Sequence, residues 1–205
     1  IVIESTVYPG TTKLLAKQIL EKNSNLKLNK DFFIGYSPER INPGDKKHQV
    51  QNIKKVLAFE TKSKKVYKRF FSLYSKITKK IVISKSIDDA ETAKVIENIQ
   101  RDLNIALMND IFLFSKRMGL NFKNIIRLAR TKWNFLRFNA GLVGGHCLPV
   151  DPYYLNFIAK RNKIKLKTVL AGRSVNEKMK SVIYDMIVKK ISYIKKFNKK
   201  NKILI

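Results

Sequence analysis

The segment from Asp88 to Met118, DDAETAKVIENIQRDLNIALMNDIFLFSKRM, decides the fold of this chain. Apolar residues recur in it at intervals of three and four, which is the spacing of one helical face. They are Ala93, Ile96, Ile99, Leu103, Leu107, Ile111, Phe114 and Met118. About 30 residues at 1.5 Å each predict a helix roughly 45 Å long, which is longer than most helices of globular proteins.

The residues before this helix alternate between short apolar strands and helices, as is typical of an α/β layer. Thr11 or Thr12 is expected to cap the first of these helices. The expected strands are Ile1–Ile3, Phe32–Tyr36, Val56–Phe59 and Lys80–Ser84, and the expected helices run to Asn23 and over Lys62–Tyr74.

The residues after the long helix predict a short helix at Lys123–Arg130 and a loop at Trp133–Pro149. A second long helix is expected over Thr168–Lys196, and a new strand begins at Lys202. Both ends of the chain stop inside expected elements, so the sequence reads as a fragment of something larger.

Composition places the chain among globular proteins, since 44% of its 205 residues are hydrophobic. No apolar run approaches the length of about 20 residues that a membrane span needs, and no signal peptide is visible. A single cysteine cannot form an internal disulfide, so a reducing compartment is expected.

The net charge of +28 raises the possibility of a nucleic-acid-binding protein. However, Lys, Ile and Asn are all abundant, and an A/T-rich coding bias would enrich all three together. The lysines are also spread along the chain, which favours a solvated surface over a specific nucleic-acid site.

Cys147, the only cysteine, lies in a loop that contains three glycines and ends four residues later at Asp151. Glycines let a backbone approach a ligand closely, and a thiol near a carboxylate suits covalent catalysis. A free cysteine is also among the most buried residue types, so the residues alone leave nucleophile and buried thiol equally open. His146 is not the expected base, because sequence neighbours usually point in different directions.

Lys94 and Asn98 share one face of the long helix and could together donate hydrogen bonds to an oxyanion, or be solvated. Glu39 lies in a Pro-bounded loop after a strand, which is a ligand-binding place in open α/β sheets but equally a turn. Thr6 follows the first strand and could touch a cofactor. No GxGxxG turn and no cluster of metal ligands is present in the sequence.

Four motifs occur in a fixed order, and through them the chain resembles the UDP-glucose/GDP-mannose dehydrogenase family. They are Glu4–Thr11 (ESTVYPGT), Ser37–Gly44 (SPERINPG), Ala90–Lys94 (AETAK) with Asn98, and Gly144–Cys147 (GGHC) with Asp151. Members of this family oxidise a sugar nucleotide at C6 twice, from alcohol to carboxylate, using two NAD.

Within the family, Thr131–Phe138, Gly141–Cys147 and Asp151–Leu155 look most like the UDP-N-acetylhexosamine 6-dehydrogenases of polysaccharide and O-antigen synthesis, although Ala140 stands where the family usually has Pro. UDP-glucose 6-dehydrogenase is the alternative. Those enzymes tend to carry Lys before the aspartate, where this chain has Val150.

The resemblance implies catalytic roles for six residues. Cys147 would attack the C6 aldehyde to give a thiohemiacetal and then a thioester, while Lys94 and Asn98 would stabilise oxyanions. Asp151 would activate the hydrolytic water or tune Cys147, Glu39 would act on that water, and Thr6 would hold a water near the cofactor. The implied substrate-binding residues are Glu39, Arg40, Lys94, Asn98, Arg137, Phe138 and Gly144, and Thr6 and Cys147 would lie near NAD.

The resemblance also implies an α/β architecture that is cut at both ends. Residues 1–86 would be the end of an NAD-binding Rossmann-like domain, 87–180 a helical dimerisation domain with the catalytic loop, and 181–205 the start of a UDP-binding domain. A cytoplasmic homodimer built on the central helices is expected, with no turnover by the isolated chain. The alternative from another class is an inactive fragment that serves as a helical dimerisation module.

Overall fold

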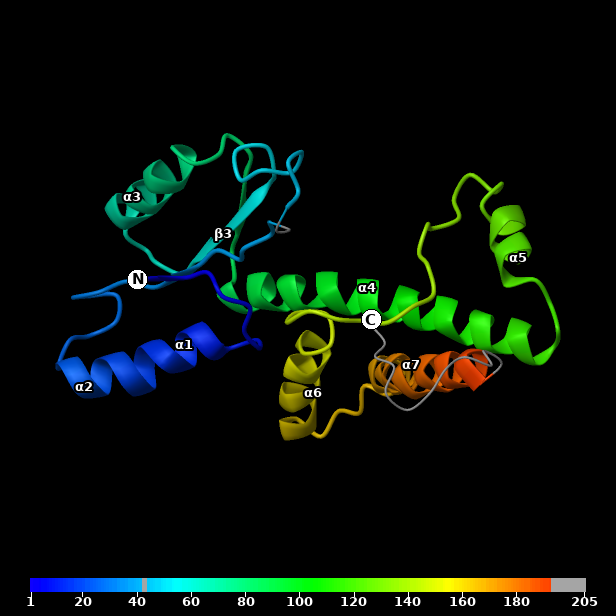
Figure 1. Ribbon diagram of the computed structural model, residues 1–205. Helices are drawn as coiled ribbons and strands as arrows, with labels where there is room; N and C mark the ends of the chain where they lie inside the picture. Colours follow the sequence, from blue (N-terminus) through cyan, green and yellow to red (C-terminus); the bar gives the residue numbers. More distant parts are fainter. Residues whose placement is uncertain (42–43, 193–205) are drawn as a thin grey trace. The chain divides into compact units, whose positions relative to one another are not determined.

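The computed structural model describes residues 1–41 and 44–192, with helices and strands as labelled in Figure 1. The chain divides into two units, which are described separately. The first comprises Ile1–Ile99 and Val150–Leu166, and the second comprises Gln100–Pro149 and the chain from Lys167 on. The elements are β1 (Val2–Ile3), α1 (Thr11–Leu15), the π-helix η1 (Ala16–Glu21), α2 (Lys22–Ser24), β2 (Gly35–Tyr36), β3 (Lys55–Phe59), α3 (Lys64–Ser75), β4 (Ile81–Ser84), α4 (Ile87–Arg117), α5 (Phe122–Ala129), α6 (Asp151–Arg161) and α7 (Lys167–Ser192).

The first unit is built on a four-stranded sheet in the order β1-β2-β3-β4. The β1–β2 and β3–β4 pairs are parallel, and the β2–β3 pair is antiparallel. Side chains alternate across a strand, and β3 follows this rule. Leu57 and Phe59 pack with Tyr74 of α3 on one face, while Ala58 joins a cluster on the other face.

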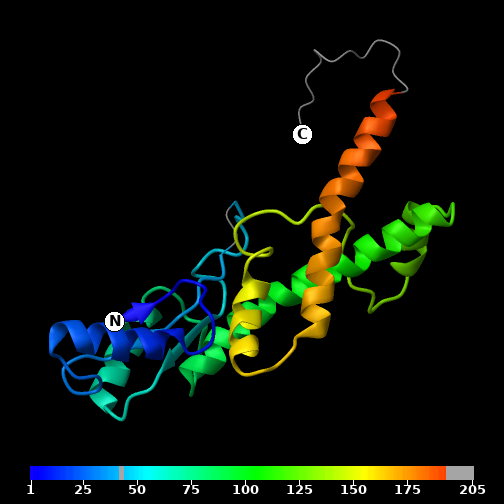
Figure 2. The ribbon, with the colours of Figure 1, turned by 90° about the horizontal axis from the view of Figure 1, so that it is seen from below.

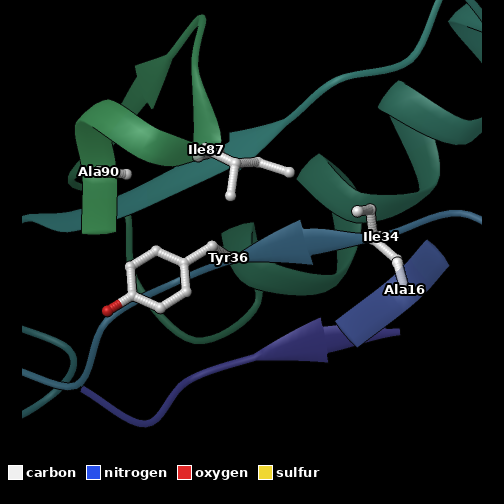
Figure 3. Packing of buried hydrophobic residues seen from close by; sticks show 6 residues of the cluster. Ala16, Ile34, Tyr36, Ile87 and Ala90 are labelled. Carbon is white, nitrogen blue, oxygen red and sulfur yellow. The ribbon is translucent and has the colours of Figure 1, made fainter. Parts of the chain in front are cut away.

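The second cluster fills the space between the sheet, η1 and the start of α4 (Figure 3). Ile34 and Tyr36 come from β2 and the residues before it, Ala16 comes from η1, and Ile87 and Ala90 come from the first turn of α4. The sheet is therefore covered on both faces, which confirms the α/β layer predicted from strand–helix alternation.

Most of the predicted elements are confirmed within one or two residues. This holds for β3, β4, α3, α4 and α5 and for the start of α7. The predicted end of the last helix at Lys196 and the strand from Lys202 lie outside the described residues. Across the described part of the chain, no helix is long and apolar enough to cross a membrane.

Two expectations about the first half of the chain were wrong, and one helix after the cysteine loop was not predicted. The expected strand Phe32–Tyr36 pairs only at Gly35–Tyr36, because its partner β1 is two residues long and Phe32 is drawn into a turn by Asn29. Neither threonine caps α1, whose N-cap is Gly10. Helix α6 was not predicted, although Asp151 and Pro152 at its start are typical of a helix N-terminus.

The first turn of α1 is capped by a residue far away in the sequence. Glu91 of α4 is completely buried, and its carboxylate accepts hydrogen bonds from Gly10 N (2.6 Å), Thr12 N (2.9 Å) and Thr12 Oγ1 (2.6 Å). Burial raises the pKa of Glu91, and these donors partly offset the rise. A negative charge at a helix N-terminus satisfies free N–H groups and interacts favourably with the helix dipole.

The second unit is held by a buried polar network between α4 and α7, which cross in Figure 2. Arg173 donates to Asp102 Oδ1 (2.6 Å), and Asn176 donates to the same oxygen (2.8 Å). Gly172 allows this close approach, because a Cβ at this position would lie 2.3 Å from Leu103 Cδ2. The α4–α7 contact is therefore polar at its centre rather than apolar.

Replacing Glu91 with Ala should lower the free energy of unfolding by roughly 3 kcal/mol, because buried N–H groups of α1 lose their acceptor. Glu91→Gln should also destabilise the chain, since its amide would present N–H groups to N–H donors. Urea denaturation of the chain measures both effects, with Gln100→Ala on an exposed position of α4 as the control. Equal midpoints for all variants would contradict the capping role.

Replacing Asp102 with Ala should cost about 3 kcal/mol, because it removes the buried carboxylate nearest to Arg173 and the acceptor of Asn176, while the half-exposed Glu177 stays at 3.5 Å. The exposed Asp110 on the same helix supplies the matched control, and Asp110→Ala should change stability by less than about 0.5 kcal/mol. Thermal unfolding followed by circular dichroism distinguishes the two. A similar loss in both variants would mean that general helix destabilisation, and not the ion pair, is responsible.

Candidate active site

The loop after β2 presents Glu39 at the carboxyl edge of the sheet. Its Oε1 accepts hydrogen bonds from the backbone N–H groups of Arg40 (2.6 Å) and Ile41 (2.7 Å). Its Oε2 lies 3.7 Å from Nζ of Lys55, and nearly half of the side chain is exposed. Burial alone would raise the pKa of Glu39, but the two N–H groups and the Lys55 ammonium lower it further than burial raises it. Glu39 is thus held as a carboxylate with one oxygen free of backbone contacts.

Arg40, the next residue, is engaged within the same unit. Its guanidinium pairs with Glu97 of α4 and donates to the backbone oxygen of Lys54 (3.3 Å). This ion pair ties the loop after β2 to α4 one residue before Asn98. These contacts give the Arg40 side chain a role in positioning the loop after β2. The substrate contact expected of Arg40 stays a proposal.

The structure brings Asn98 and Asp151 together. Both are buried, and Nδ2 of Asn98 donates a hydrogen bond to Oδ2 of Asp151. Asp151 is the first residue of α6, and Asn98 lies on α4, one turn beyond the half-buried Lys94. Two residues that are 53 positions apart in the sequence therefore form one buried polar pair, with an ammonium on the same helix face.

Thr6 lies between β1 and α1 and is half-buried. In the first unit, Thr6 thus follows β1 and Glu39 follows β2. These two strands are parallel, so their carboxyl ends meet at one edge of the sheet. That edge is where open α/β sheets bind their ligands.

The cysteine loop belongs to the second unit. Cys147 is exposed, and so are Gly144 and His146. Gly145, two residues before the cysteine, has a φ of +84°, which a residue with a Cβ rarely adopts. Asn109 of α4 anchors the start of this loop: its amide accepts from Gly141 N (2.8 Å) and donates to Gly141 O (3.0 Å).

The residues implied to bind the nucleotide sugar lie upstream in the same unit. Arg137 is exposed, and Phe138 is half-buried, with its backbone oxygen accepting from Arg130 (3.2 Å). Trp133, four residues before Arg137, is 91% exposed.

Three residues near the site were missed by sequence reasoning. Lys55 is buried beside Glu39, Glu91 caps α1, and Tyr36 points a buried hydroxyl away from the sheet (Figure 3). The sequence could have drawn attention to Glu91, because acidic residues are rare in this chain and number only 15. Nothing in the sequence distinguishes Lys55 from the other lysines.

The described residues contain no group of three or more side chains suited to a metal ion. For a dinucleotide, the carboxyl ends of β1 and β2 offer a suitable edge, with Thr6 and Glu39 on it. The glycine-rich turn that holds a pyrophosphate is not in this sequence. The residues present therefore fit part of a nicotinamide dinucleotide.

Comparison with known proteins places both halves of the chain in one family. The NAD binding domain of the UDP-glucose/GDP-mannose dehydrogenase family matches residues 1–82, and the central domain of the same family matches residues 88–178.

Individual relatives agree with this match. UDP-N-acetyl-D-glucosamine 6-dehydrogenase from Pseudomonas aeruginosa is 48% identical over 190 residues, which cover 92% of this chain and 44% of that protein. The enzyme of the same name from Salmonella typhi is 44% identical, with the same coverage of the two chains. This chain spans just under half the length of the curated relatives that it matches.

The solved structures agree as well. The UDP-D-ManNAc dehydrogenase of Pyrococcus horikoshii superposes with a TM-score of 0.81 at 31% identity, over 93% of this chain and 44% of that one. The NDP-N-acetyl-D-galactosaminuronic acid dehydrogenase of Methanosarcina mazei gives 0.79 at 30% identity, over 95% and 43%. With both family domains, the ordered motifs and the fold in agreement, the chain belongs to the UDP-glucose/GDP-mannose dehydrogenase family.

Proposed function

We propose that this chain is the catalytic part of an NAD-dependent UDP-N-acetylhexosamine 6-dehydrogenase. The observation that carries the proposal is the buried hydrogen bond between Asn98 and Asp151, in the same unit as the ionised Glu39. The relatives quoted above are named for N-acetylhexosamine nucleotides, which supports this substrate class over UDP-glucose. Surface polysaccharide synthesis and a cytoplasmic location, where the Cys147 thiol stays reduced, belong to the same proposal.

The reaction oxidises C6 of the sugar by four electrons. When bound, NAD accepts a hydride in each of the two oxidation steps. The C6 alcohol first loses a hydride and its hydroxyl proton to give an aldehyde. The sulfur of Cys147 then bonds to the aldehyde carbon, and the proton from the thiol ends on the aldehyde oxygen. The resulting thiohemiacetal loses a second hydride and its hydroxyl proton to become a thioester. Water breaks the carbon–sulfur bond, releasing the carboxylate and returning the thiol.

Residues of the first unit supply the charges for these steps. Lys94 and Asn98 stabilise the oxyanions that form at C6, and Asp151 holds the Asn98 amide in one orientation. Glu39 takes the proton of the hydrolytic water through its Oε2, because its Oε1 is already bound by two N–H groups. Thr6 holds a water near the cofactor.

In this proposal, Cys147 supplies the nucleophile. It precedes Asp151 by four residues, which span at most about 14 Å when fully extended. Gly144 and Gly145 give the loop the freedom to bring the thiol to C6, and Arg40, Arg137 and Phe138 contact the nucleotide sugar.

Assembly as a homodimer through α4 forms part of the proposal. Leu107, Phe114 and Met118 are each more than half exposed, and at 100° per residue they form one stripe on the helix. A long helix with an exposed apolar stripe is suited to pairing with a second copy. The same stripe supports the second candidate, an inactive dimerisation module, which would pair without turnover.

Replacing Cys147 with Ala should abolish carboxylate formation, with a loss of at least about a thousandfold. The assay uses a hybrid enzyme in which this chain replaces the matching segment of the Pseudomonas aeruginosa relative, supplied with UDP-N-acetylglucosamine and NAD. His146→Ala in the same hybrid is the matched control and should retain activity.

Unaltered carboxylate formation by Cys147→Ala would contradict the thioester mechanism. A hybrid that folds and dimerises but produces no NADH would favour the dimerisation module instead. The 205-residue chain alone should give no NADH, because positioning both hydride partners needs binding energy from regions outside it.

Replacing Phe114 with Glu should convert the dimer to monomers, because a carboxylate in an apolar interface is costly to desolvate. Sedimentation velocity of the chain measures the change. Lys116→Glu, on the opposite side of α4 from the stripe, is the control and should leave the dimer intact. A wild-type chain that sediments as a monomer at all concentrations would contradict this mode of assembly.

A further inference from the structure

Lys55, the first residue of β3, is only 4% exposed. Its backbone is fixed in the sheet, since its N–H donates to the oxygen of Lys80 (2.8 Å). Lysine is almost never buried to this degree unless its ammonium is paired. The position of Lys55 is thus set by the sheet, and its partners show what the ammonium does.

The Lys55 ammonium lies between two carboxylates from neighbouring strands. Its Nζ is 3.4 Å from Oε1 of Glu4, which follows β1, and 3.7 Å from Oε2 of Glu39, which follows β2. It also lies 5.6 Å from the centroid of the Tyr74 ring, within the range of a cation–π contact. The hydroxyl of Tyr74 donates to the same Glu4 oxygen (2.8 Å).

Glu4 and Glu39 are held side by side, because Glu39 N donates to the backbone oxygen of Glu4 (3.1 Å). Their side chains are 49% and 47% exposed, whereas the Lys55 side chain is 5% exposed. The buried cation therefore faces two carboxylates that keep contact with water. Such an arrangement orients both carboxylates while each side chain keeps contact with water.

The other hydrogen-bond donors and cations near Glu39 do not bind its Oε2 in place of Lys55. The backbone N–H groups of Arg40 and Ile41 both bind Oε1. The Arg40 guanidinium is paired with Glu97, and the Tyr74 hydroxyl binds Glu4. Among the described contacts, Lys55 supplies the positive charge on the Oε2 side of Glu39.

We propose that Lys55 is a positioning residue, which holds Glu39 ionised by pairing with its Oε2 and shares its charge with Glu4. The lowered pKa of Glu39 agrees with this arrangement. The catalytic consequence rests on the proposed function, because Glu39 acts on a hydrolytic water only in that reaction. The coupling between Lys55 and Glu39 is a property of the folded chain and is measurable without any substrate.

The first experiment titrates Glu39 by carbon-detected NMR in the 205-residue chain. Lys55→Met, which keeps the length of the side chain and removes its charge, should raise the pKa of Glu39 by about 0.5–1 unit. Lys55→Arg should restore most of the wild-type value. The neighbouring Lys54 is exposed, and Lys54→Met is the matched control with no expected shift.

A second variant keeps the test decisive if Lys55→Met does not fold. Glu4→Gln removes the competing carboxylate, so the ammonium is left to Glu39, and the pKa of Glu39 should fall below the wild-type value. An unchanged Glu39 titration in Lys55→Met or Glu4→Gln would overturn the proposal. So would a Lys55→Arg variant that behaves like Lys55→Met.

The second experiment asks whether the coupling serves catalysis. In the hybrid enzyme, Lys55→Met should slow thioester hydrolysis roughly tenfold to a hundredfold with KM little changed, because Glu39 stays ionised but loses the group that orients its Oε2. Intact-protein mass spectrometry should then show the acyl adduct accumulating on Cys147. A shifted Glu39 pKa with unchanged hydrolysis would contradict the role assigned to Glu39 and leave the Lys55–Glu39 coupling supported.

Discussion

The buried carboxylate of Glu91 is the interaction on which the first unit depends. It accepts three hydrogen bonds from Gly10 and Thr12 and so fastens the start of α1 to α4. The segment between β1 and α1, which contains Thr6, is thereby fixed at its far end. The same helix carries Lys94 and Asn98 within the next two turns. One carboxylate therefore orders both the loop after β1 and the helix that presents the amide and the ammonium.

Desolvating Glu91 is costly, as its raised pKa shows. The cost is tolerated because all three donors are backbone or hydroxyl groups that would otherwise be buried without acceptors. In the second unit, a buried charge is likewise held by partners from a distant part of the sequence, but the charge is positive. There the buried guanidinium of Arg173 is held by the carboxylate of Asp102. Each unit is thus centred on a buried charge whose partners come from a distant part of the sequence.

The charge imbalance of the chain is informative about its site. Only 15 residues are acidic against 43 Lys and Arg. Glu39, Glu91, Asp102 and Asp151 all make specific contacts within their own unit. In a sequence this rich in lysine, a surface lysine carries little information, whereas a buried carboxylate such as Glu91, Asp102 or Asp151 marks a specific contact. Lys55 is the exception, because its burial is decided by the sheet and has no signature in the sequence.

The local elements were predictable, since periodicity and capping residues act over a few positions. The strand β3, the helix α3 with its Ser63 cap, and the length of α4 all follow from such short-range patterns. The start of α1 and the helix α6 were not predicted correctly, because the cap of α1 comes from Glu91 and the Asp151–Pro152 signal followed a glycine-rich loop. The ordered motifs named candidate site residues, but they did not predict the contacts among them.

By itself, the sequence determined the α/β class, the long helix and the family, because these depend on short patterns and on motif order along the chain. It also named Cys147, Glu39, Asn98 and Asp151 as the residues of interest. Only the tertiary structure decided that Asp151 pairs with Asn98, that Glu91 serves α1, and that Lys55 faces Glu39. Those pairings join residues between 16 and 81 positions apart. They arise from how strands and helices pack, which no local pattern of residues encodes.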